Sequence, residues 1–132
     1  MDDALEFLKA AKTYYLATVD EEGNPRVRPF GTIAKFEGRL YIQTGKKKAA
    51  SRQMHAHPRI EICAVGKGGT WLRLAADAVE DDRVEARQAV LNEYPGLHRM
   101  YAADDGNCEV FALENATATF CSFTAEPRTV TF

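Results

Sequence analysis

The amino-acid sequence predicts a mainly β or α+β domain, an antiparallel β-barrel of six to seven strands flanked by short helices. Runs of β-branched and aromatic residues recur along the chain, and turn-forming residues separate them. Shorter stretches with helical spacing lie before and between these runs. No repeat, low-complexity tract or flexible linker divides the 132 residues. We therefore expect residues 1–132 to form one domain.

The first half of the chain predicts a helix followed by an antiparallel meander. Asp2 or Asp3 can cap a helix whose apolar residues recur at helical spacing. Pro29 indicates an edge strand or a bulge within the second strand. The strands are expected at 14–19, 26–36 and 39–44, with turn residues at 20–25 and 37–38.

The second half predicts two further helices and the remaining strands. A short helix begins at Ala49 and cannot continue through Pro58. Asp81 and Asp82 can cap the next helix, which Pro95 ends, and 97–102 adds a helical turn. Strands are expected at 59–65, 70–79, 108–113 and 116–123.

The composition excludes several classes of function. The chain has 17 Lys and Arg against 19 Asp and Glu, so it lacks the basic excess of a nucleic-acid-binding protein. No apolar run approaches the ~20 residues of a membrane-spanning helix, and the acidic start is unlike a signal peptide. We expect a cytoplasmic protein, without nucleic-acid or membrane partners, in which Cys63, Cys108 and Cys121 are reduced and buried.

The common catalytic motifs are also absent. The sequence contains no glycine-rich dinucleotide or P-loop motif, no H-E-x-x-H and no G-x-S-x-G. His55 and His57 are two residues apart, a spacing that does not share one helix face. No metal site is therefore expected.

A lysine run at the start of the second expected helix suggests an anion site. Thr44 and Gly45 precede Lys46, Lys47 and Lys48. Backbone N–H groups at a helix N-terminus favour an anion, whereas cations there are mildly unfavourable for the helix itself. A phosphate in front of this helix would explain the lysines. The alternative is a solvated lysine run on a loop.

Two pairs of side chains on strands could contact a planar ligand. Arg26 and Arg28 alternate with Val27, so they share one face of their strand and could bind an oxyanion or stack on a ring. Trp71 and Arg73 repeat this arrangement. The alternatives are an exposed polar face on an edge strand and a tryptophan that belongs to the core.

These motifs together resemble the pyridoxamine 5'-phosphate oxidase-like flavoproteins. Their order and spacing match that family over nearly the whole chain, from about residue 2 to residue 123. The matching stretches are Tyr15-Leu16-Ala17-Thr18-Val19, Gly23-Asn24-Pro25-Arg26-Val27-Arg28-Pro29, Leu40-Tyr41-Ile42-Gln43-Thr44-Gly45-Lys46-Lys47-Lys48 and His57-Pro58-Arg59-Ile60.

The resemblance implies a split β-barrel with Greek-key connections and a homodimer that binds FMN at its subunit interface. By motif position, Arg26, Val27, Arg28 and Pro29 would lie along the flavin ring and ribityl chain. Thr44, Lys46, Lys47 and Lys48 would hold the phosphate, with Ser51 and Gln53 following on the helix. Trp71 falls near a flavin-contacting polar residue of the full-length oxidases.

The resemblance further implies an FMN-dependent oxidoreductase that acts on a small organic substrate, with an electron donor such as NAD(P)H. The full-length oxidases end in a segment with a tryptophan and an arginine that serve flavin and substrate, and this sequence does not match it. Oxidation of pyridoxamine phosphate itself is therefore not expected. Two alternatives stay open: a non-catalytic or stress-related flavin-binding electron carrier or sensor, and a binder of another phosphate-bearing or haem-type ligand.

Overall fold

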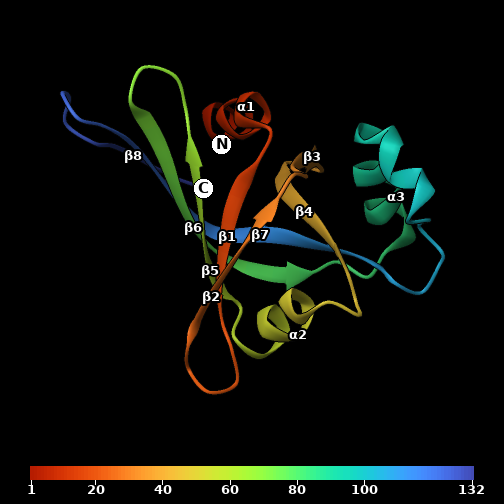
Figure 1. The fold of residues 1–132 in the computed structure, drawn as a ribbon. Helices are drawn as coiled ribbons and strands as arrows, with labels where there is room; N and C mark the ends of the chain where they lie inside the picture. Colours follow the sequence, from red (N-terminus) through yellow and green to blue (C-terminus); the bar gives the residue numbers. More distant parts are fainter.

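The computed structural model describes residues 1–132, and its eight strands form one antiparallel sheet (Figure 1). The strand order is β2-β1-β5-β6-β7-β4-β3, and β8 pairs with β7 beside this path. The strands are β1 (Tyr14–Val19), β2 (Pro25–Phe30), β3 (Ala34–Phe36), β4 (Arg39–Gly45), β5 (Arg59–Val65), β6 (Thr70–Glu80), β7 (Cys108–Ser122) and β8 (Arg128–Thr131). The helices are α1 (Asp2–Ala11), α2 (Ala49–Ala56) and α3 (Val84–Glu93), and a 3₁₀ turn, η1, spans Pro95–Arg99. The predicted antiparallel α+β architecture is confirmed.

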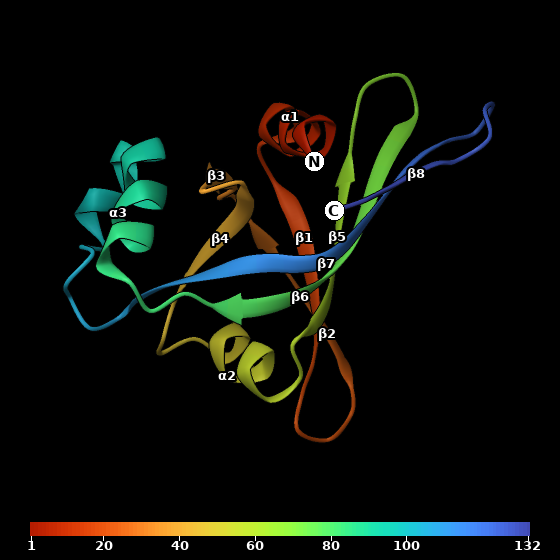
Figure 2. The same ribbon diagram turned by 180° about the vertical axis from the view of Figure 1, so that it is seen from behind.

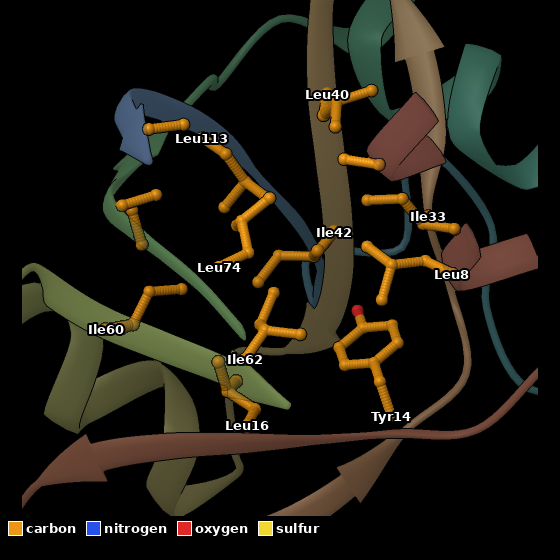
Figure 3. Close-up of a cluster of buried hydrophobic side chains, with 14 of the residues drawn as sticks. Leu8, Tyr14, Leu16, Ile33, Leu40, Ile42, Ile60, Ile62, Leu74 and Leu113 are labelled. Atoms are coloured by element: carbon orange, nitrogen blue, oxygen red, sulfur yellow. The ribbon is translucent and has the colours of Figure 1, made fainter. Parts of the chain in front are cut away.

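The sheet curls around one core that side chains from both of its halves fill (Figure 3). Leu16 of β1 and Ile62 of β5 are fully buried and meet Ile42 of β4 and Leu74 of β6 there. Leu8 of α1 packs on the same cluster. Residues alternate between the two faces of a strand, so the opposite face of β1, β2, β5 and β6 points away from this core.

The helices lie at the ends of the curled sheet. Figures 1 and 2 show α1 and α2 at opposite ends, with α3 apart from both beside β3 and β4. Helix α2 follows β4 directly, so its N-terminus lies close to the end of that strand. None of the helices has the length and apolar character that crossing a lipid bilayer requires.

The strand expected at 26–36 is two strands, β2 and β3, separated at 31–33. The Tyr14 hydroxyl donates a hydrogen bond to the carbonyl of Thr32. The Tyr94 hydroxyl accepts from the N–H of Ile33 and donates to its carbonyl, both at 2.9 Å. Side chains from distant segments therefore bind these backbone groups, and the strand is interrupted where the sequence carries a continuous β signal.

The strands expected at 108–113 and 116–123 are instead one continuous strand, β7. Asn115 has a positive φ of 48°, and the pairing of β6 with β7 shifts register between Ala75 and Asp77. The break expected between residues 113 and 116 is therefore a β-bulge, because β6 pairs with β7 on both sides of it. Strand β8, which was not predicted, pairs with the part of β7 beyond this bulge.

Two smaller predictions are wrong. Cys63 is exposed, because it lies on the outward face of β5 between the buried Ile62 and Ala64. Its thiol and the other two thiols are free. No aspartate side chain caps α1 or α3, whose N-cap residues are Met1 and Arg83.

Candidate functional site

A cavity of about 410 Å³ lies between β2, the end of β4, the start of α2 and the segment 94–101. Its wall combines a cationic and polar side with an apolar and aromatic side. The polar side is formed by Arg28, Thr32, Gln43, Thr44 and Lys48, and the apolar side includes Phe30, Tyr94, Leu97, Met100 and Tyr101. A ligand with an anionic group and a planar apolar body would match both sides.

Thr44, on β4, carries a buried hydroxyl without a partner at this cavity. The residue is 3% exposed, and its Oγ1 is the one buried side-chain polar atom in the protein with no hydrogen bond. Leaving a buried hydroxyl unbonded costs about 1–3 kcal/mol, so such groups usually have a partner. A ligand atom in the cavity would supply that partner.

The N-terminus of α2 opens onto the same cavity. Lys48 is the N-cap residue, no side chain caps the helix, and no acidic residue lies in its first turn. The N–H groups of Ala49 and Ala50 have no acceptor within the chain, and both residues line the cavity. Free N–H groups and the helix dipole favour an anion at this position.

Arg28, on β2, is a half-buried cation at the cavity wall. Its Nη1 donates to Thr18 Oγ1 at 2.7 Å and to the Leu16 carbonyl at 3.2 Å, and its Nη2 donates to Gln53 Oε1 at 2.6 Å. No carboxylate lies within ion-pair distance of the guanidinium. Burial therefore lowers the pKa of Arg28, and a bound anion would compensate the charge.

The loop before β7 fixes the lysine segment from the other side. The Asn107 carbonyl accepts from the Lys46 N–H at 2.8 Å, and its Oδ1 accepts from the Lys47 N–H at 3.2 Å. At Gly45 a Cβ atom would come within 3.0 Å of the Tyr101 hydroxyl and 3.1 Å of Asn107 Nδ2. A side chain at this position would therefore require Tyr101 and Asn107 to shift, and glycine lets them pack closely against β4.

A second, polar hollow of about 660 Å³ lies on another side of α2. His55 Nε2 is 2.7 Å from Glu109 Oε2 and 3.7 Å from Glu80 Oε1. The ligand atoms of these three residues lie within 4.8 Å of one another, close enough to share a metal ion. However, Ser51 and His55 already occupy both oxygens of Glu109, and these hydrogen bonds account for the cluster without an ion.

Comparison with known proteins identifies the family. Residues 1–122 match the family model described as pyridoxamine 5'-phosphate oxidase. This chain belongs to the pyridoxamine 5'-phosphate oxidase family. No curated protein matches the sequence.

Among solved structures, the chain is similar to a NimC/NimA family protein from Clostridium acetobutylicum, with 41% identity and a TM-score of 0.95 over 100% of this chain and 92% of that one. It also resembles General Stress Protein 26 from Bacillus anthracis str. Sterne, with 13% identity and a TM-score of 0.76 over 99% of this chain and 97% of that one. HutZ, the haem storage protein from Vibrio cholerae, shares 18% identity and a TM-score of 0.65 over 86% and 87% of the two chains. The last two likenesses show the fold alone.

In this member of the oxidase family, five of the candidate residues come together. Arg28, Pro29, Thr44 and Lys48 line the cavity. Gln53 lies behind them and accepts the hydrogen bond of the Arg28 guanidinium.

The other candidate residues lie outside this cavity. Arg26 pairs with Asp20 at 2.8 Å, and Val27 and Lys47 are exposed. Lys46 and Ser51 line the polar hollow, and Trp71 packs against Phe123 with ring centroids 5.1 Å apart. The two arginines share a strand face as predicted, but Arg26 has an acidic partner and Arg28 has none.

The sequence analysis missed the apolar wall and the buried acid. Tyr94, Leu97, Met100 and Tyr101 line the cavity from a segment that carries no family motif. Glu109 could have been found, because it is a charged residue inside the apolar run 108–113. It is 2% exposed, and a buried charge in an apolar strand needs specific partners.

Proposed function

We propose that this member of the pyridoxamine 5'-phosphate oxidase family binds FMN and is an FMN-dependent oxidoreductase. The main support for this proposal is that Thr44, whose buried hydroxyl has no partner, lines one cavity together with Lys48 and the free N–H groups of α2. These groups fit a phosphate, which accepts hydrogen bonds on several oxygens and carries negative charge. Riboflavin lacks the phosphate, so the site should prefer FMN.

The remaining cavity residues fit the rest of the cofactor. Phe30, Tyr94 and Leu97 provide apolar surface for a planar ring, and Arg28 adds a positive charge beside it. When bound, FMN would supply hydride and electron transfer. The Arg28 guanidinium, held by Thr18 and Gln53, would stabilise negative charge that develops on the reduced ring.

We further propose that the protein is a homodimer whose subunits meet through the outward face of the sheet. Tyr15, Val27 and Val65 lie on this face and are 50%, 68% and 70% exposed. Trp71 lies beside Val65 across the strand pair, and Phe123 packs on it while remaining 86% exposed. Several exposed apolar groups on one sheet face are typical of a protein–protein interface. A partner could also complete the flavin site, since the cavity is open.

The absorption spectrum of the purified protein tests the cofactor. The two visible bands of oxidised flavin would support FMN, whereas a Soret band would favour the haem-type alternative. Bleaching of the flavin bands by NAD(P)H, and their return with an added electron acceptor at catalytic rates, would support the oxidoreductase over a non-catalytic flavin carrier. A flavin that NAD(P)H does not reduce would contradict this donor. A cytoplasmic location is part of the proposal, supported by three free thiols.

A further inference from the structure

The buried carboxylate of Glu109 holds two turns of helix α2. Ser51 Oγ donates to Glu109 Oε1 at 2.6 Å, and His55 Nε2 lies 2.7 Å from Glu109 Oε2. Ser51 and His55 are four residues apart, so they share one helix face. One side chain on β7 therefore contributes to the position and the rotation of this short helix, together with the buried Ala50 and Met54 and the hydrogen bonds of Gln53.

Packing alone does not explain an acid at this position. Glu109 is 2% exposed and has no lysine or arginine within ion-pair distance. The neighbouring residues of its strand, Cys108, Val110 and Phe111, are buried and apolar. A buried carboxylate that is balanced only by a hydroxyl and an imidazole is costly compared with an apolar side chain.

The register of the sheet connects Glu109 to the cavity. Glu109 on β7 pairs directly with Thr44 on β4, and paired residues point to the same side of a sheet. Helix α2, which Glu109 holds, brings Lys48, Ala49 and Ala50 to the cavity that Thr44 also lines. Glu109 therefore contributes to the distance between Thr44 and the helix N-terminus, together with the backbone hydrogen bonds of Lys46 and Lys48 in the turn between them.

We propose that Glu109 is a positioning residue that holds the N-terminus of α2 against Thr44 as a preformed phosphate cradle. This inference rests on the proposed FMN function. The charge of Glu109 and its positioning of helix α2 have opposite effects on the affinity for FMN. The negative charge of Glu109 by itself opposes a nearby phosphate, so its removal should strengthen FMN binding if charge alone mattered. Loss of positioning should weaken it.

The experiment compares Glu109→Gln with Glu80→Gln, which removes a carboxylate from the same hollow without touching Ser51. The readout is the ratio of the dissociation constants of riboflavin and FMN, measured by flavin fluorescence on cofactor-free protein. We expect this ratio to fall about tenfold or more in Glu109→Gln, as for loss of a charge-assisted contact. In Glu80→Gln it should stay the same or rise.

A purely structural role predicts a different result, namely a lower melting temperature with an unchanged ratio. That result, or an equal fall in Glu80→Gln, would overturn the inference. If Glu109→Gln does not fold, Ser51→Ala replaces it in the test, because this variant keeps the carboxylate and removes one of its hydrogen bonds. The ratio should fall in Ser51→Ala and should keep the parent value in Ser51→Thr, which retains a hydroxyl. A parent protein that binds both flavins equally would instead refute the phosphate cradle itself.

Discussion

Replacing Thr44 by valine should stabilise the cofactor-free protein and weaken FMN binding. Valine has nearly the shape of threonine and suits a strand, so the substitution removes the hydroxyl and little else. Thr44 Oγ1 is buried without a hydrogen bond. In the free protein the hydroxyl is therefore a cost, and with a ligand bound it becomes a contact.

The general free energies of hydrogen bonds give the size of both effects. An unpartnered buried hydroxyl costs about 1–3 kcal/mol, so Thr44→Val should raise the free energy of unfolding by about 1 kcal/mol or more. For a domain of this size each kcal/mol raises the melting temperature by roughly 3–5 °C. A lost hydrogen bond to a charged phosphate is worth about 1.5–3 kcal/mol, which corresponds to roughly a ten- to hundredfold weaker binding of FMN.

Thermal unfolding of cofactor-free protein and fluorescence titration with FMN and riboflavin measure the two effects. Thr18→Val is the matched control, because Thr18 is equally buried but its hydroxyl donates to Gln53 and accepts from Arg28. That variant should lower the melting temperature. If Thr44→Val also lowers it, or if FMN binds to it with the parent affinity, the reasoning is wrong.

Four further predictions follow from the same geometry. Lys48→Ala should lower FMN affinity about ten- to hundredfold with little change for riboflavin, whereas Lys67→Ala, in the exposed turn between β5 and β6, should bind both flavins as the parent does. Arg28→Ala should lower the reduction potential of the bound flavin by about 20 mV for each kcal/mol of lost interaction, with Arg28→Lys intermediate; a redox titration without any shift would contradict a role beside the ring. Hydrogen bonds from Arg83 hold the pKa of Asp81 well below its ordinary value of 3.8, so the stabilisation that the Asp81 carboxylate provides is present above that value and is lost as pH falls. Asp81→Asn should reduce the melting temperature at pH 7. A difference in melting temperature between parent and variant that stayed constant down to about pH 2 would be inconsistent with this linkage. Val65→Asp should convert the proposed dimer to monomer on gel filtration, and an unchanged dimer would place the interface elsewhere.

Part of the candidate site could be predicted because its chemistry is local. Thr44 and Lys48 lie within five residues of each other at a strand-to-helix junction, and such a junction brings its residues to one place in any fold that contains it. The sequence alone could not separate Lys48 from Lys46, which line different hollows. The conformation of the turn decides this, because the Asn107 carbonyl, far away in the sequence, accepts from the Lys46 N–H and the Lys48 N–H donates to the Gly45 carbonyl.

The apolar wall of the cavity depends on long-range packing. Tyr94 and Tyr101 follow α3 in the chain, and nothing in their local sequence indicates that they face β2 and β4. Tyr94 reaches the cavity because its hydroxyl binds the backbone of Ile33, 61 residues away. Contacts of this kind carry no periodicity that a sequence reading can detect.

The sequence by itself determined the class of the fold, the family and most element positions, because alternation, turn residues and motif spacing are local signals. Only the tertiary structure decided where strands break and where they continue. The β signal at 31–33 is overridden by two distant tyrosine hydroxyls, and the break expected between residues 113 and 116 is bridged by pairing with β6. The tertiary structure also decided that Arg28 faces the cavity without an acidic partner while Arg26 pairs with Asp20. The physical reason is the same in each case. Backbone groups and charged side chains form hydrogen bonds and ion pairs with the partners that folding brings near, and the local sequence does not specify those partners.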